Sequence, residues 1–293
     1  MRKLLVTLTV LAFALFSANA EEKTKTFKFG DIKSLNIEYC YQVHVTKGNS
    51  GDVRVVYDST VEDMMDINYI SGTDRLEMKM DKKIQKTLKN GRMPRIEVYL
   101  EMDEISALDV SGAASVSFEG EFKGEDLDIE LSGASKIKSF NVKGQSLRFI
   151  CSGASNGTIE GNFSGDVDLV ISGASRLNCA GNGKNVSAQV SGASRLTLEG
   201  NFSDADVACS GASSAQMEGN AKTAEFECSG ASRIEAKDFV TKDLRADLSG
   251  ASKAEVHATS NLVYTISRAC KIVYHGDAVL KNLTAEPNVI KGR

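Results

Sequence analysis

The 293-residue sequence contains no tryptophan, two prolines, three histidines and no large excess of either charge. Its 35 basic and 39 acidic residues give a net charge of −4, which argues against a general nucleic-acid binder because such proteins usually carry a strong basic excess. His44, His257 and His275 are too few for a histidine-rich metal site. The fractions of hydrophobic residues (42%) and charged residues (25%) are ordinary for a folded protein and argue against wholesale disorder.

Long apolar runs are also lacking, apart from one at the start of the chain. Arg2 and Lys3 precede the apolar run 4–16, which is too short to span a bilayer comfortably, and the run ends in an Ala-x-Ala cleavage site at 18–20. We therefore expect a signal peptide over 1–20, cleavage after Ala20, export, and a mature net charge of −6. No second apolar stretch follows, so no transmembrane segment is expected after cleavage. The cleavage point lacks the cysteine that a lipoprotein would have, so we do not expect an acylated lipoprotein.

The six cysteines lack the short spacings of a disulfide-stapled domain. Most stand where equivalent positions hold Val, Leu or Ile, so we expect them to be small buried apolar residues. Cys209 and Cys228 should lie in one inward column on adjacent coils as free thiols, because parallel Cβ vectors in register suit a disulfide poorly.

A repeat of about twenty residues organises most of the chain. Ser-Gly-Ala recurs with spacings of 18 to 21 residues, counting a degenerate last copy at 267–269, and it begins at Ser111, Ser132, Ser152, Ser172, Ser191, Ser210, Ser229 and Ser249. Apolar residues alternate on both sides of the motif, as in Leu127–Leu131 and Leu196–Leu198, and no useful 3.6-residue period occurs between 106 and 275. The pattern predicts an all-β fold, a right-handed parallel β-helix of about nine coils in a rod ~40 Å long.

Each motif can be assigned structural roles. The residue before each Ser and the one two positions earlier should face inward, the Gly should permit a tight corner, and the Ala should fit where the walls converge. A second corner is expected at Lys143–Gln145, where an inserted residue should be tolerated. The repeated Ser is interpreted as structural, since a nucleophile needs a base within hydrogen-bond range and the motif has no paired His.

Outside the repeat, residues 21–105 are predicted to form a β-rich domain that caps the first coil of the helix over 106–280, and residues 281–293 should form a C-terminal cap or tail. The strands expected in the first of these regions are Thr26–Phe29, Leu35–Thr46, Asp52–Tyr57, Asp66–Ile70, Arg75–Met80 and Arg95–Leu100.

The strand over 27–37, the Leu-Asp-Val-Ser-Gly-Ala stretch at 108–113 and the serial Ser-Gly-Ala-Ser coils resemble the head GIN domain family of auto-transporter adhesins, over essentially the whole mature chain. The resemblance implies a secreted or surface β-helical protein of Gram-negative bacteria, located in the periplasm, at the cell surface or outside the cell. It brings no catalytic residues.

One outward column is unusually basic. Four residues after each Ser, six of nine positions are cationic, and stacking would place them in one line: Lys136, Arg176, Arg195, Arg233, Lys253 and Lys271. This line could hold an extended anionic ligand such as an acidic glycan. The alternative is a solubilising face whose cations are neutralised by a nearby Glu column: Glu119, Glu160, Glu199 and Glu218.

A second outward block is acidic and comprises Asp206, Glu225, Glu227 and Asp247, beside Arg245. Its oxygen atoms could hold Ca²⁺, but no Asp/Gly-rich nonapeptide repeat accompanies them and Arg245 could neutralise them instead. We expect no metal site and no cofactor.

The sequence favours a non-enzymatic, adhesin-like binding protein that presents a flat face to an extracellular glycan or an envelope polymer. A polysaccharide lyase or hydrolase is one alternative, but its cleft should show long loops around an acid–base site, and no coil has an insertion longer than two residues. A structural envelope or matrix protein that acts by stacking is the other. The sequence leaves the oligomeric state open.

Overall fold

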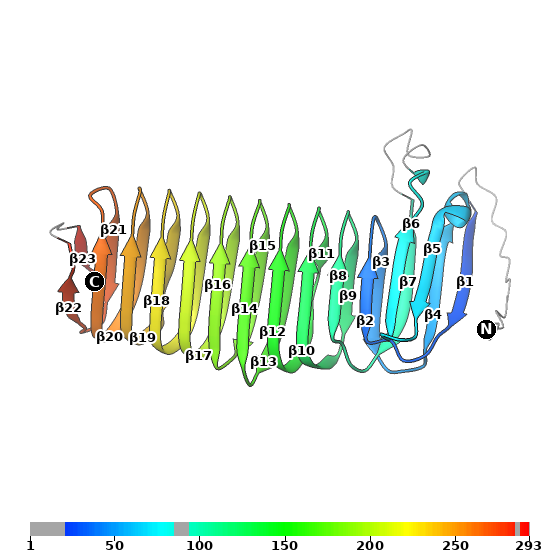
Figure 1. Ribbon diagram of the computed structural model, residues 1–293, viewed down its shortest axis with the longest axis horizontal. Coiled ribbons are helices and arrows are strands. Elements are labelled where there is room, and N and C mark those ends of the chain that lie inside the picture. The colour runs from blue at the N-terminus through cyan, green and yellow to red at the C-terminus, as the bar shows by residue number, and fades with distance from the viewer. Residues whose placement is uncertain (1–20, 85–93, 285–287, 293) are drawn as a thin grey trace.

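The computed structural model describes residues 21–84, 94–284 and 288–292, so the expected signal peptide at 1–20 lies outside the described residues. The chain forms the predicted parallel β-helix of about nine turns. In Figure 1 it rises along the near strands, turns at the upper edge, descends along the far strands and advances toward the C-terminus, which makes the coil right-handed. We call each full turn of the chain a rung.

The helix is flattened into two parallel faces. The first face carries the strands that lead up to each Ser-Gly-Ala: β8 (Ala107–Val110), β10 (Glu121–Leu131), β12 (Asn141–Cys151), β14 (Asp166–Ile171) and β16 (Asn185–Val190). The second face carries the strands that follow it: β9 (Ser115–Glu119), β11 (Lys136–Ile137), β13 (Asn156–Phe163) and β15 (Arg176–Asn182). The next strands run on from the second face to the following first face: β17 (Arg195–Cys209), β18 (Ser214–Cys228), β19 (Arg233–Leu248) and β20 (Lys253–Ile266).

The core consists of the predicted inward columns. In the rung that leads to Ser152, Phe149 and Cys151 are fully buried, and the same two positions are buried in every rung from Leu108 and Val110 to Tyr264 and Ile266. Strand pairing holds equivalent residues opposite one another, as at Ile129↔Phe149. Period-2 alternation and in-register stacking therefore produce continuous apolar ladders.

The Ser-Gly-Ala corners depend on glycine for two reasons. The corner glycines from Gly112 to Gly250 have φ of +71° to +75°, which side chains rarely adopt. From Gly133 onward, a Cβ on each would lie 2.4–2.9 Å from the carbonyl oxygen of the corner glycine one rung earlier. The alanine N–H groups donate to these same carbonyls at 2.7–2.8 Å, so the corners form one hydrogen-bonded ladder.

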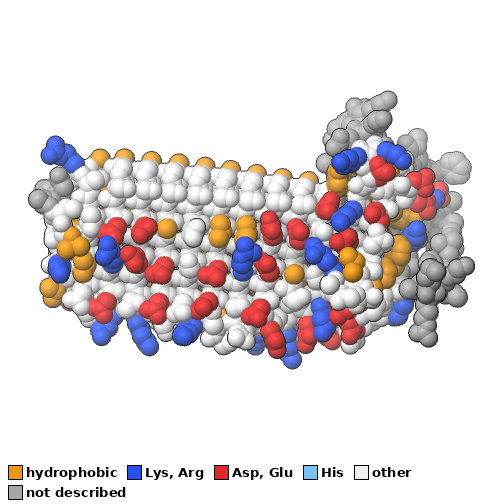
Figure 2. All heavy atoms as spheres, in the orientation of Figure 1, with side chains coloured by type: hydrophobic (Ala, Val, Ile, Leu, Met, Phe, Trp, Pro, Cys, Tyr) orange, Lys and Arg blue, Asp and Glu red, His pale blue; other side chains and the backbone are white. Residues whose placement is uncertain are grey.

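The corner corrects one expectation. The motif alanines are exposed at the edge of the rod, where Figure 2 shows a row of apolar side chains along the upper margin, and they do not fill converging walls. The buried small residue is the following serine, which is at most 2% exposed at Ser135, Ser155, Ser175, Ser194, Ser213, Ser232 and Ser252. The turn at the left-handed glycine changes which residues point inward. Most of the buried hydroxyls bond to nearby groups, as Ser213 does to the Val190 carbonyl at 2.9 Å, whereas Ser175 Oγ has no partner in the described ranges.

The opposite edge carries a second ladder, of glycine and asparagine. Asn182 donates to Asn162 at 2.7 Å, Asn201 donates to Asn182 at 2.7 Å, and Asn220 donates to Asn201. Lys143–Gln145, expected to be a tolerant corner, lies inside β12 in this region. A Cβ on Gly144 would collide with the Gly124 carbonyl oxygen, so these residues are stacked strand and not a free corner. Tolerance of an insertion there stays a prediction.

The N-terminal end is assembled out of sequence order. The rung of β2 (Ser34–Ile37) and β3 (Gln42–Lys47) lies between the rung of β8 and β9 and an outer rung of β6 (Arg75–Met80) and β7 (Ile96–Met102), and all these pairings are parallel. The expected strand Leu35–Thr46 is therefore two strands, separated by a corner at Tyr39 with φ of +70°. Parallel pairing thus crosses the domain boundary expected at 105/106, although that boundary itself stays a prediction.

Antiparallel strands cover the outer rung: β4 (Asp52–Asp58) pairs with β7, β1 (Glu22–Lys28) with β4, and β5 (Met65–Ile70) with β6. The short 3-10 helix η1 (Ser59–Met64) buries Val61 against this end. At the other end, β21 (Lys271–His275) and β22 (Val279–Asn282) both pair with β20, and β23 (Val289–Lys291) pairs with β21 one strand further out. Across the described ranges, no helix has the length and hydropathy needed to cross a bilayer.

Candidate functional site

The structure places the six predicted cationic residues in a single file on the second face. Strand register joins Lys136 to Asn156, Arg176, Arg195, Ser214, Arg233, Lys253 and Lys271 in that order. All six cationic side chains are exposed, and neighbouring strands are about 4.8 Å apart. We call this column, which has one residue per rung from Lys136 to Lys271, the cationic line. Each of its residues lies at the start of a second-face strand, just after the corner.

Most of these cations are not neutralised by the protein. Arg233 pairs with Glu235 at 3.1 Å, but within the described ranges none of the other five has a carboxylate oxygen within 4.0 Å. The Glu column expected to neutralise them starts four residues further along each strand, for example at Glu199 after Arg195, which corresponds to about 13 Å of extended chain. Five of the six charges on the line therefore have no carboxylate at contact distance in the described ranges.

The cationic line also contains a hollow that sequence reasoning did not anticipate. Ser214 is the short side chain between Arg195 and Arg233, and the cavity above it has a volume of about 350 Å³. Gln216 and Glu235 lie along its margin. The one signal in the sequence for this hollow is that the Ser214 side chain is much shorter than those of Arg195 and Arg233, its neighbours in the column.

The first face carries the opposite charge. Figure 2 shows this face, on which acidic side chains outnumber basic ones. In the predicted acidic block, Arg245 Nε lies 3.1 Å from Glu225 and 2.8 Å from Asp247. In the part of the chain that the structure describes, no three His, Cys, Asp or Glu side chains are arranged to hold a metal ion. Arg245 therefore forms ion pairs with two of the four acidic residues, as expected if it takes the place of Ca²⁺ in this block.

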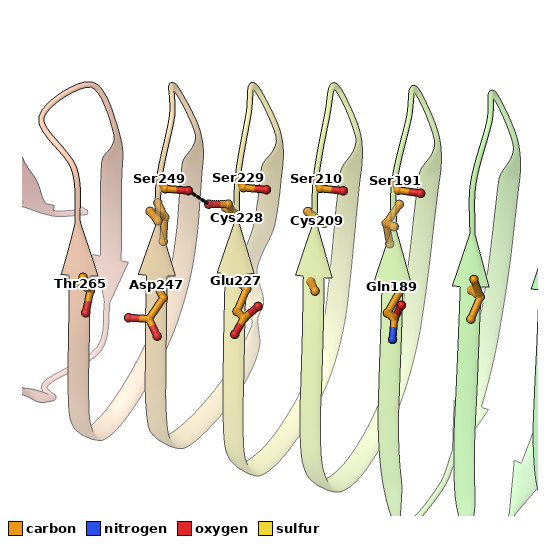
Figure 3. Close-up of a pocket in the computed structure, with 14 residues that line it drawn as sticks. Gln189, Ser191, Cys209, Ser210, Glu227, Cys228, Ser229, Asp247, Ser249 and Thr265 are labelled. Carbon is orange, nitrogen blue, oxygen red and sulfur yellow. Dashed lines mark hydrogen bonds between the residues drawn. The ribbon is translucent and has the colours of Figure 1, made fainter.

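A shallow groove of about 590 Å³ runs along this first face below the corners. In Figure 3 the motif serines form its upper margin, at Ser191, Ser210, Ser229 and Ser249, and Gln189, Glu227, Asp247 and Thr265 lie one step below. The Ser249 hydroxyl donates to the Cys228 carbonyl at 3.5 Å. With two carboxylates and no cation among its lining residues, this groove repels an anionic ligand and gives an internal contrast to the cationic line.

The cysteine thiols are the strongest potential nucleophiles in the protein. All six cysteines are free and buried, which confirms the prediction for Cys209 and Cys228. Burial raises the pKa of the Cys209 thiol to about 11, and burial together with the nearby Cys209 raises that of Cys228 to about 12. These thiols are therefore poor nucleophiles at neutral pH.

Among the described residues, one serine–histidine contact lies away from the motif serines. Ser117 Oγ lies 3.0 Å from His44 Nδ1 on the second face near the N-terminal end. The His44 ring stacks on Tyr99 at 4.9 Å, and the Arg54 guanidinium covers Tyr99 at 4.1 Å. These contacts hold the cluster together on the second face, with the ring of His44 packed against Tyr99.

The sequence matches the family described as "Putative auto-transporter adhesin, head GIN domain" over residues 32–178 and again over 167–278. The chain belongs to this family. The two matched segments together run from Ile32 to Ala278, which confirms the resemblance carried by the Ser-Gly-Ala coils.

A comparison with solved structures found similar chains at low sequence identity. A "putative adhesin" of Parabacteroides distasonis is 15% identical with a TM-score of 0.48, and the alignment covers 93% of this chain and 97% of that one. A second, from Parabacteroides merdae, is 16% identical with a TM-score of 0.48 and coverages of 92% and 93%. A "putative lipid binding protein" of Parabacteroides distasonis is 18% identical with a TM-score of 0.44 and coverages of 92% and 94%. A comparison with curated proteins found no match.

Proposed function

We propose that this head GIN domain protein is an exported, non-enzymatic adhesin that holds an extended acidic glycan or envelope polymer along the cationic line. The observation that supports this is the register of Lys136, Arg176, Arg195, Arg233, Lys253 and Lys271, five of which have no ion-pair partner in the described ranges. A solubilising face gains nothing from placing like charges on adjacent strands, because they repel. A polymer with regularly spaced anionic groups turns this repulsion into attraction.

The geometry suits a polymer better than a small ligand. Each exposed charge contact is weak on its own, but contacts along one chain add through multivalency. The rest of the protein repels anions, since the mature chain has a net charge of −6 and the first face is acidic. Binding should therefore be confined to the cationic line and should weaken with added salt.

The test compares the mature protein with a charge-reversed variant. Arg176→Glu, Arg195→Glu and Arg233→Glu are combined, and binding to immobilised dextran sulfate and polygalacturonate is measured at increasing salt. The wild type should bind at least one of the two with an affinity that falls as salt rises, and the triple variant should not bind. Its melting temperature should stay close to wild type, because exposed ion pairs contribute little to stability.

A matched control separates local binding from net charge. Lys184, Lys222 and Lys242 are exposed residues between the second face and the following first face, and reversing all three changes the net charge by the same amount. This control should retain binding. Equal loss in both triple variants, or retained binding in the arginine variant, would show that the cationic line is not the site.

Export has its own measurement. The mass of the protein recovered outside the cytoplasm should correspond to a chain that begins at Glu21. A mature chain that retains Arg2 and Lys3 would contradict the cleavage site.

A further inference from the structure

The neutral positions of the cationic line have structure of their own. Ser214 replaces a long cation between Arg195 and Arg233, and the cavity of about 350 Å³ lies where that side chain would be. The strands of the two arginines are two rungs apart, or about 10 Å. A group seated over Ser214 would therefore have a guanidinium on each side.

Hydrogen-bond donors converge on the same hollow. In the described ranges neither the Ser214 hydroxyl nor the Gln216 amide has a side-chain partner, and both lie at the hollow. Guanidinium groups present planar pairs of donors that match the oxygens of carboxylate, sulfate and phosphate groups. Glu235 is the one carboxylate at the margin, and its bond of 3.1 Å to Arg233 keeps that guanidinium over the second face.

Resting on the proposed function, we propose that the hollow over Ser214 is a discrete subsite that takes one oxyanion group of the bound polymer, held between Arg195 and Arg233. The hydroxyl of Ser214 and the amide of Gln216 complete its coordination. Asn156, another neutral hydrogen-bonding residue, lies in the same way between Lys136 and Arg176, three rungs or about 14 Å away. The two positions would take anionic groups from one extended chain.

This arrangement differs from a simple strip of positive charge in a measurable way. If only charge density matters, a neutral rung is a defect, and a cation placed there strengthens polyanion binding. If the hollow is a subsite, the same cation fills it and displaces the anionic group. The two accounts predict opposite signs for one substitution.

The test is Ser214→Arg, measured with dextran sulfate and polygalacturonate under the conditions used above. The fold should accommodate it, because Arg195 and Arg233 occupy the equivalent positions on either side. Despite the added charge, affinity should fall about tenfold, as expected for losing charge-assisted hydrogen bonds. Ser214→Gln fills the hollow without charge and should also weaken binding. Gln189→Arg adds the same charge on the first face and should change affinity by less than about twofold.

The outcomes separate the two proposals. If Ser214→Arg binds as tightly as wild type or more tightly, the subsite is refuted while the cationic line stands. If wild type binds neither polymer at low salt, the proposed function itself fails. A folding defect in Ser214→Arg, detected by circular dichroism, leaves the decision to Ser214→Gln, for which unchanged affinity would refute the subsite. Preference for one probe identifies whether the group taken is a sulfate ester or a carboxylate.

Discussion

Replacing one corner glycine tests the ladder that shapes the whole rod. Gly192 has φ of +74°, and a Cβ there would lie 2.5 Å from the Gly173 carbonyl oxygen. An alanine in the left-handed region costs about 1–2 kcal/mol. Moving the Gly173 carbonyl away also strains its bond of 2.8 Å from the Ala193 N–H, worth about 1 kcal/mol. Gly192→Ala should therefore lower the free energy of unfolding by about 2–3 kcal/mol.

Gly72 supplies the matched control, since the same substitution there meets nothing within 4 Å. Gly72→Ala should leave stability unchanged or raise it by up to about 1 kcal/mol, because alanine restricts the unfolded chain. Urea unfolding followed by circular dichroism measures both, with an unchanged slope as evidence that the transition is comparable. If Gly192→Ala differs from Gly72→Ala by less than about 1 kcal/mol, the corners are not held by stacked glycines and our account of them is wrong.

Three further outcomes are expected. Asn201→Ala should lower the free energy of unfolding in urea by about 1 kcal/mol although the side chain is exposed, because Asn201 links Asn182 to Asn220 by hydrogen bonds. Asn178→Ala, on the second face, should leave it unchanged. Buried thiols with folded pKa values of about 11 at Cys209 and about 12 at Cys228, against an ordinary 9.0, contribute stability that is complete below pH 9.0 and is lost as pH rises toward these values. The urea midpoint should therefore fall above pH 9.0, and less steeply in the Cys209→Ala/Cys228→Ala variant; an equal slope would contradict this. Burial acts to raise the pKa of the Cys270 thiol, but hydrogen bonds involving Ser252 and Ser267 outweigh it and lower this pKa. Peptide mapping after brief alkylation of the native protein should therefore find Cys270 modified first. Earlier labelling of Cys179, whose pKa is raised by burial, would count against this.

Much of the rod could be predicted from sequence because its two periods act directly on neighbouring residues. Alternation decides which side of a strand is buried, and the twenty-residue period decides which residues stack, so the Phe149 column and the cationic line both follow from counting. The corners resisted the same counting. The corner glycine, such as Gly133, has a left-handed conformation, which changes the parity of alternation and sends Ala134 outward and Ser135 inward.

Features that depend on a neighbouring rung were also out of reach. Gly144 looks like part of a flexible corner in its own rung, and only the Gly124 carbonyl of the neighbouring rung shows how closely the two strands stack there. The hollow at Ser214 arises because Arg195 and Arg233 on adjacent rungs are long while Ser214 is short. The order of the N-terminal rungs depends on which distant strands pair with β2 and β3, and the composition of those strands does not encode it.

The intercalated rung of β2 and β3 gives the array a unique starting point. The rungs after Ser132 are close copies, so sliding the chain by one whole repeat would leave most apolar columns matched and would cost little locally. The β2–β3 rung has no such copy, because its corner residue is Tyr39 and Gly112 stacks directly on the Tyr39 backbone. It also leaves the ribosome before either of its partners, β6–β7 and β8–β9, and both must arrive before its two edges are covered. A stack whose register is shifted by one repeat therefore has no pairing partner for the β2–β3 rung. The register of the entire rod is thus determined near its N-terminal end.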